Sequence, residues 1–245
     1  MRILHIDYGF DYPFPGGAQK RVFEECRRLA QTDELLLVYS SSFTDWRGTK
    51  KEFDSKNIPF KTVSLDIREI FQPWRRNLAR TLLLPVRKNV AKPIISTIKS
   101  FKPDIVHLHA GGGRSLINAV YAAKATNIPI VLMMHNHWPL CVAIGYFDFK
   151  SGTFCKDEIV CGRCLNVRFK TIVSFLYRNR FARYVLKHVD HYICYTEFTK
   201  SLLAKAGVAS EKVTVIPPGI ENVRIKNTVD FSQRKYITFS GRISP

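Results

Sequence analysis

The feature that most constrains the fold is a repeated order of apolar run, turn and helical periodicity. The run at 34–40 contains Leu-Leu-Leu-Val at 35–38, and the run at 129–134 contains Ile-Val-Leu-Met-Met at 130–134. Strands of this composition are buried on both faces, as in parallel sheets. Residues 18–30 carry apolar side chains at helical spacing, and helices between strands give right-handed crossovers. The sequence therefore predicts an α/β fold with a doubly wound, mainly parallel, Rossmann-like sheet.

Seven strands and the loops after them define where a site is expected. The strands are expected at 2–6, 34–40, 60–65, 104–109, 129–134, 191–195 and 212–216, and the helices at 18–30, 74–84, 86–101, 115–125, 169–187 and 199–206. Ligands of doubly wound sheets bind at the carboxyl ends of the strands. The loops 9–17, 110–115, 135–165 and 196–199 are therefore the places to look for functional residues, and 135–165 is expected to be irregular.

The predicted domain boundary lies near residue 220. Residues 1–220 read as one Rossmann-like domain, and 221–234 read as a polar linker. Residues 235–245 begin a new strand, which cannot bury both of its faces alone. We expect this strand to be the first element of a C-terminal domain that the sequence truncates.

The charge is strongly basic, with 38 Lys and Arg against 20 Asp and Glu. It is concentrated at 68–102 and 163–188, which favours anionic partners such as phosphorylated substrates or lipid headgroups. No nucleic-acid motif is present, so no nucleic-acid partner is expected. The basic helical stretch 74–102, with apolar side chains every fourth residue, fits either an interfacial helix on an anionic membrane or a helix packed on the sheet with a solvated basic face.

The cysteines bear on the cellular compartment and on metal binding. No secretory signal or membrane-spanning run is apparent, so a cytoplasmic protein is expected, with a peripheral place on the inner face of the plasma membrane as the extension. Cys141, Cys155, Cys161 and Cys164 form the pattern C-x13-C-x5-C-x2-C. This spacing suits a structural zinc, but unpaired thiols and an iron–sulfur cluster are alternatives. Cys26 and Cys194 are expected to be core residues.

Six motifs in order resemble the N-terminal domain of glycosyltransferase family 4. They are PGGAQK (15–20), PDIVHLH (103–109), HNHWPLC (135–141), VDHYICYTEFTKSLL (189–203), KVTVIPPGI (212–220) and FSGRISP (239–245). The resemblance implies the acceptor-side half of a two-Rossmann-domain enzyme. Such an enzyme moves a sugar from a nucleotide-diphosphate donor to a hydroxyl of a sugar or lipid-linked acceptor, with retention and without a cofactor. The Lys-Gly pair that usually follows FSGR in the family is absent.

Gly16, Gly17 and His135 are the residues on which this interpretation rests. Gly16-Gly17 opens a helix, whose free N–H groups and dipole favour the donor diphosphate. The alternative is a tight turn that needs positive φ. His135 matches the active-site histidine of the family, which contacts the donor sugar, and the alternative is a histidine satisfied at a strand end. Asn136 stands where many members have Asp.

Other candidates belong to the acceptor side. His109 lies at the end of its strand and can reach the site, whereas His107 is expected to be a core histidine. Gly111 and Gly112, followed by Arg114, form either a second anion cradle or a plain turn. Glu197 can line the cleft, although Thr196 beside it is expected to cap the next helix.

Two functional hypotheses remain open from the sequence. The first is the transferase, in which case this fragment alone is expected to be inactive because the nucleotide-binding half is missing. The second is a non-catalytic half that binds acceptor or lipid and pairs with a separate donor-binding chain.

Overall fold

Seven parallel strands form one sheet in the described part of the chain. The computed structural model describes residues 1–8, 16–40, 46–64, 88–109, 113–141, 147–148, 152–155, 180 and 182–219. Their order across the sheet is β3-β2-β1-β4-β5-β8-β9. The strands are β1 (Arg2–Tyr8), β2 (Glu34–Ser40), β3 (Lys61–Ser64), β4 (Ile105–His109), β5 (Ile130–Met133), β8 (His191–Cys194) and β9 (Val213–Val215). The predicted doubly wound sheet is confirmed, and its chain order reverses between β1 and β4, which is where such folds form a ligand crevice.

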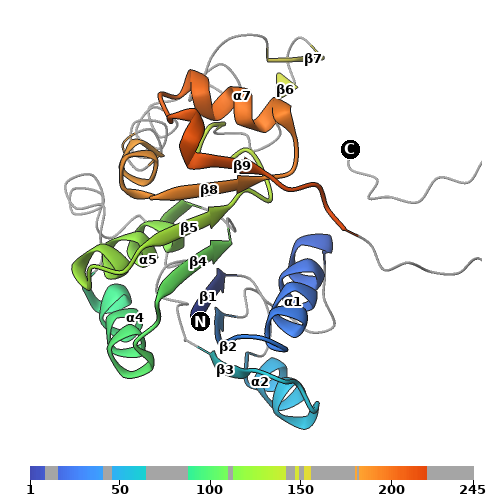
Figure 1. Cartoon of the computed structure of the whole chain (residues 1–245), viewed down its shortest axis with the longest axis vertical. Coiled ribbons are helices and arrows are strands. Elements are labelled where there is room, and N and C mark those ends of the chain that lie inside the picture. Colours follow the sequence, from blue (N-terminus) through green and yellow to red (C-terminus); the bar gives the residue numbers. More distant parts are fainter. Residues whose placement is uncertain are drawn as a thin grey trace, which may run out of the picture.

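Helices cover both faces of the sheet. They are α1 (Gly17–Leu29), α2 (Trp46–Ser55), α4 (Lys88–Phe101), α5 (Gly113–Ala125) and α7 (Glu197–Lys205), with a further helical segment at 182–188 and a 3₁₀ turn, η3 (Ser210–Lys212). Figure 1 shows α1 and α2 on one side of β1–β3 and α4 and α5 on the other. The sheet is therefore the middle layer of a three-layer sandwich.

The strand residues divide between two cores according to their alternation. Leu4 and Ile6 of β1 join the core that includes α4 and α5. Ile3, one residue out of phase, joins the smaller core that includes Val22 and Cys26 of α1. Because successive side chains of a strand point to opposite faces, every odd-numbered residue of β1 faces α1.

Helix α2 and a small hairpin were not expected from the sequence. The sequence of α2 is largely polar, and among its described side chains only Thr49 and Phe53 are buried, so it lacks an apolar stripe. The segment predicted to be irregular contains an antiparallel pair, β6 (Phe147–Asp148) and β7 (Thr153–Phe154). The predicted helix at 74–84, the linker 221–234 and the strand at 235–245 lie outside the described residues.

Helix α4 settles the interpretation of the basic stretch over 88–101. Ile94 and Ile98 are buried in the core beside α5, whereas Lys92 and Lys99 are exposed. The alternative of a helix packed on the sheet is therefore confirmed for α4, because its apolar side chains already have a partner. Among the described residues, the helices are too short or too polar to cross a membrane.

Candidate functional site

Side chains from four adjacent strands meet at the carboxyl edge of the sheet, on the face that α1 covers. His5 of β1 stands opposite His107 of β4 in the parallel register. His109 is two residues further along β4 and is level with Met133 of β5. Because alternate residues share a face, His5, His107 and His109 all point to the α1 side, whereas Leu108 between the β4 histidines joins the opposite core.

Three histidines and a tyrosine form a continuous chain of hydrogen bonds. Tyr195 Oη lies 2.8 Å from His135 Nδ1, and His135 Nε2 lies 3.0 Å from His109 Nδ1. The chain ends at His5, whose Nδ1 lies 3.0 Å from His109 Nε2. We call His5, His107, His109 and His135 the histidine array. Together with Tyr195 after β8, the array runs from β1 through β4 to His135 after β5, so it connects the sheet interior to the carboxyl edge.

Burial keeps the histidine array neutral. It lowers the pKa of His5 and of His135 to about 4, and the Arg21 guanidinium adds to the effect at His135. Burial also lowers the pKa of His107 and His109 well below the usual histidine value, with the neighbouring histidines adding to it. Neutral imidazole has one N–H donor and one acceptor nitrogen, so each ring can pass on a hydrogen bond in one direction.

The direction of this chain follows from its buried end. His5 Nε2 is buried and has no hydrogen-bond partner among the described residues. If Tyr195 donated to His135, each ring would donate inward, and the chain would end in an orphaned N–H at His5. The opposite direction ends in a bare lone pair there, and buried N–H groups without partners are the rarer of the two. The second direction is therefore favoured, and it leaves the Tyr195 hydroxyl proton available to a ligand.

Helix α1 supplies two charged side chains to the same face, one turn apart. Glu25 Oε1 lies 3.2 Å from His107 Nδ1, and burial raises the Glu25 pKa to about 7. Burial thus opposes charge on both partners, so this contact is better described as a hydrogen bond than as an ion pair. The Arg21 guanidinium lies 4.9 Å from the Tyr195 ring centroid, within cation–π range. Arg21 therefore places a positive charge beside Tyr195, the outer end of the chain of hydrogen bonds.

Helix α1 begins at Gly17 with an N-terminus suited to an anion. The N-cap Gly16 has no side-chain capping hydrogen bond, and the first turn has no acidic residue. Gly16 has φ −154°, an extended conformation open to any residue, so the alternative of a positive-φ turn does not account for it. A Cβ on Gly17 would meet no described atom within 4 Å. Within the described chain, neither backbone strain nor crowding therefore requires glycine at position 17.

The remaining acceptor-side candidates are only partly placed. Gly111 and Gly112 lie outside the described residues, and Arg114 is in the first turn of α5. Thr196 is the N-cap of α7 and its side chain accepts a hydrogen bond from the Thr199 N–H at 3.2 Å, so the capping prediction is confirmed. Glu197 is exposed in the first turn, where its charge also suits the helix dipole.

The proposed cysteine site is half described. Cys141 is buried in the core that includes α4 and α5, and Cys155 is partly buried against the same core. Cys161 and Cys164 lie outside the described residues, so the structural zinc stays a prediction. Cys26 and Cys194 are buried core residues as expected, and burial raises the pKa of the Cys26 thiol well above its usual value.

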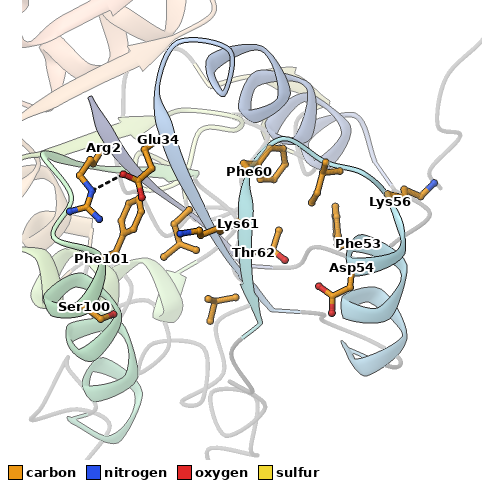
Figure 2. A pocket seen from close by; sticks show the side chains of 13 residues that line it. Arg2, Glu34, Phe53, Asp54, Lys56, Phe60, Lys61, Thr62, Ser100 and Phe101 are labelled. Carbon is orange, nitrogen blue, oxygen red and sulfur yellow. Dashed lines mark ion pairs between the residues drawn. The ribbon is translucent and has the colours of Figure 1, made fainter.

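A cavity of about 580 Å³ lies away from this edge (Figure 2). It is lined by residues at the amino ends of the first three strands, including Arg2, Glu34 and Lys61, and by side chains of α2 and α4. Arg2 Nε and Glu34 Oε2 are 3.1 Å apart at its rim. Because ligands of parallel sheets bind at the carboxyl ends, this cavity is not the candidate site.

Sequence reasoning missed Arg21, Glu25, Tyr195 and His5 as members of the site. Tyr195 ends the predicted sixth strand at the same edge as His135, which was a usable signal. Arg21 and Glu25 are four residues apart on α1 and therefore share a helix face. His5 gives no local signal, because only the pairing of β1 with β4 brings it to His107.

Comparisons with known proteins agree with the predicted family and fold. The family model described as Glycosyltransferase Family 4 matches residues 15–224. None of the curated proteins compared with the chain matches it significantly.

Solved structures with the same fold are larger proteins. HepE (Alr3699) of Anabaena in complex with UDP is 15% identical, with a TM-score of 0.50 over 90% of this chain and 44% of that one. UDP-GlcNAc 2-epimerase of Neisseria meningitidis bound to UDP-GlcNAc is 15% identical, with a TM-score of 0.50 over 88% and 46%. S. aureus MnaA with UDP is 16% identical, with a TM-score of 0.50 over 87% and 44%. The chain thus spans less than half the length of the structures it matches, and at this identity the likeness shows the fold alone.

Proposed function

The chain belongs to glycosyltransferase family 4, and on that premise we propose that it is the acceptor-side lobe of a sugar-nucleotide-utilising transferase. The reaction is transfer of a hexosyl group from a nucleotide-diphosphate sugar to a hydroxyl acceptor, with retention of anomeric configuration. A second, donor-binding lobe closes over the carboxyl edge of the sheet and holds the nucleotide.

The observation that carries the proposal is the meeting of an anion site and a neutral polar chain at one edge. The uncapped start of α1 follows β1, and His135 follows β5, two strands away in the sheet order β1-β4-β5. Arg21, one turn into α1, contacts the tyrosine that bonds His135. A nucleotide-diphosphate sugar needs such a pair of subsites, one for the diphosphate and one for sugar hydroxyls.

The start of α1 acts on the leaving group. Breaking the bond between the anomeric carbon and the phosphate oxygen puts negative charge on the diphosphate. The free N–H groups at Gly17 and after it, the helix dipole and the Arg21 guanidinium stabilise this charge. The described first turn contributes no acidic side chain that would oppose the phosphate. The proton of the acceptor hydroxyl passes to the departing phosphate oxygen.

His135 and Tyr195 act on the sugar. The low pKa of His135, about 4, makes it a neutral hydrogen-bonding group at pH 7 rather than a charged acid. Its bonds to Tyr195 and His109 hold its ring from both sides. A ring fixed in this way can contact the donor sugar without reorganising, but both of its nitrogens are already bonded, so the Tyr195 hydroxyl is the donor toward a sugar oxygen. His109 then serves as a positioning residue for His135.

The similar structures indicate which nucleotides to test first. The structures of HepE and MnaA contain UDP, and that of the Neisseria epimerase contains UDP-GlcNAc. UDP-sugars are therefore the first donors to test. Because one of these proteins is an epimerase, the products must be identified rather than inferred from UDP release.

The test uses this chain joined to its donor-binding lobe and a panel of nucleotide-diphosphate sugars. Donor hydrolysis and transfer are followed by nucleotide release, and NMR of the product reports the anomeric configuration and any epimerisation at C2. We expect transfer with retention, and a loss of kcat of about 10²-fold or more for His135→Ala, because the variant removes both the ring beside the sugar and the bond that orients the Tyr195 hydroxyl donor. A product inverted at the anomeric carbon, or epimerised without transfer, would contradict the proposal.

His191→Ala is the matched control. His191 begins β8, at the opposite end of the strands, and its Nε2 bonds the Thr214 hydroxyl at 2.8 Å. It removes one hydrogen-bonded histidine without touching the carboxyl edge. Turnover within about twofold of the parent is expected, and an equal loss in both variants would show that His135 matters only for folding. Turnover by the 245-residue chain alone would contradict the division of labour between two lobes.

A further inference from the structure

The inner end of the histidine array has the composition of a metal site. His5, His107, His109 and Glu25 each offer one ligand atom, and these four atoms lie within 4.8 Å of one another. They come from β1, β4 and α1, so residues far apart in the sequence converge on one point. The three histidines are buried, with exposed fractions of 0%, 7% and 1%.

Two nitrogens in this cluster lack the partners that buried polar atoms normally have. His5 Nε2 and His107 Nε2 are both buried and without a hydrogen-bond partner among the described residues. The two rings belong to register partners, and their centroids are 4.9 Å apart. Buried polar atoms without partners cost free energy, and several in one place indicate that something binds there. A lone pair on a neutral imidazole is a ligand for a metal ion.

The charges at this place also favour a cation. Glu25 is a partly buried carboxyl group facing the histidines, and Asp7, on the same face of β1 as His5, is 5% exposed. Among the described residues, Arg21 is the positively charged side chain that faces the histidines, one helical turn before Glu25. The two carboxyl groups, Glu25 as a ligand and Asp7 nearby, would balance the charge of a divalent ion, which burial requires.

We propose that His5, His107, His109 and Glu25 form a buried site for a first-row divalent metal ion, with zinc as the expected occupant. Imidazole-rich sets with one carboxylate suit Zn²⁺ and its neighbours, whereas Mg²⁺ and Ca²⁺ prefer oxygen ligands throughout. The metal is a structural clamp that joins α1 to β1 and β4. It also fixes the tautomer of His109, whose other nitrogen then donates toward His135, as second-shell groups do around metal-bound histidines.

The geometry needs only local contraction. The side chains are already close together: His5 Nδ1 and His109 Nε2 are 3.0 Å apart, and His107 Nδ1 and Glu25 Oε1 are 3.2 Å apart, so rotation of the His5 and His107 rings can turn their unpartnered Nε2 atoms toward an ion. Tetrahedral ligands at the usual zinc distances are about 3.3 Å apart. A pair at the 4.8 Å limit must therefore close by about 1.5 Å, which ring rotation and movement of the Glu25 side chain can supply.

The test is metal content and cobalt spectroscopy of the purified chain. The protein is stripped with chelator, titrated with Zn²⁺ or Co²⁺, and the bound metal is measured by elemental analysis. We expect one ion per chain at this site, with a visible ligand-field spectrum of Co²⁺ bound by nitrogen and oxygen. Glu25→Gln and His107→Gln should each weaken Zn²⁺ binding by at least about 100-fold.

Two further variants separate this site from its alternatives. Glu24→Gln is the matched control for Glu25→Gln, because Glu24 is adjacent on α1 but pairs with Arg27 and should leave binding unchanged. The double variant Cys161→Ser with Cys164→Ser removes the C-x-x-C pair and should retain the N/O-bound ion. Near-ultraviolet circular dichroism checks that each variant is folded. If His107→Gln does not fold, the metal affinity of Glu25→Gln alone decides the test.

Three results would overturn the proposal. They are the absence of stoichiometric metal, unchanged binding in folded Glu25→Gln and His107→Gln, and binding that disappears with the cysteines and shows a thiolate charge-transfer band. None of these results bears on transfer from a nucleotide sugar, which the His135 variant tests separately.

Discussion

Replacing Gly17 by alanine should improve the stability of the domain while weakening its anion site. Gly17 is the first residue of α1 and is exposed. A Cβ built there meets no described atom within 4 Å, and its φ lies outside the left-handed region. Alanine is therefore accommodated by the described part of the fold, and we infer that glycine stands here to allow close approach of a phosphate.

The expected magnitudes have opposite signs for stability and binding. Alanine is favoured over glycine by up to about 1 kcal/mol in a helix, and by about half of that at its first position. A gain of about 0.5 kcal/mol raises the melting temperature of a domain of this size by about 1–2 °C. A methyl group against a phosphate should weaken pyrophosphate binding by about tenfold, or about 1.4 kcal/mol.

The assay measures both quantities on the same samples. Thermal unfolding gives the melting temperature, and NMR shifts of the backbone amides at 17–19 during pyrophosphate titration give the affinity. Gly207→Ala is the control, because Gly207 has φ +83° after α7 and alanine there should cost about 1–2 kcal/mol without affecting the anion. A Gly17→Ala variant that is stabilised but binds pyrophosphate as before would refute the argument that Gly17 exists for close approach of a phosphate.

Three further outcomes are expected. In the metal-free protein, lowering the pH from 7 to 5 should cost on the order of 5 kcal/mol in urea unfolding. The histidines take up protons near pH 6.5 in the unfolded chain, but their lowered pKa values prevent this in the folded chain, so acid favours unfolding. This loss of stability exceeds the gain of about 2 kcal/mol that comes from protonation of Glu25 near its raised pKa of about 7. An unchanged urea midpoint would contradict this prediction. Tyr195→Phe should lower kcat by up to about tenfold with little change in melting temperature, since it removes one hydrogen bond at the carboxyl edge of the sheet. An unaltered kcat would exclude the Tyr195 hydroxyl from the reaction. Thr196→Ala removes the cap of α7 and should destabilise the domain by about 1 kcal/mol without changing kcat, as seen in paired melting and turnover measurements.

The fold was predictable because its strands are buried on both faces. The run from Leu35 to Val38 is buried along its whole length, so both the apolar composition and the parallel pairing follow from one cause. Helix α2 was not predictable in the same way. Its only buried described side chains are Thr49 and Phe53, and a helix that packs through so few residues leaves no periodic pattern in the sequence.

The candidate site was predictable at single positions but not as a connected chain. His135 and Gly17 were identified by the family resemblance together with their places at the expected edge, where each ends or begins an element. The bond between His109 and His135 depends on the β4–β5 register, in which His109 pairs with Met133 and thus comes within reach of a residue two places further along. The sequence pattern gives the order of the strands along the chain but not the register between them. These contacts could therefore be found only from the structure.

The alternation of β4 explains why function and stability are separable in this lobe. Val106 and Leu108 are fully buried toward α4 and α5, and they carry the packing of the strand. His107 and His109 point the other way, toward α1, where polar contacts replace apolar ones. Because these two sets of side chains lie on opposite faces of one strand, a change of His109 alters the chain to His135 without removing apolar contacts from the larger core. A change of Leu108 should do the reverse, since it opens a cavity in that core and leaves the hydrogen-bonded chain in place.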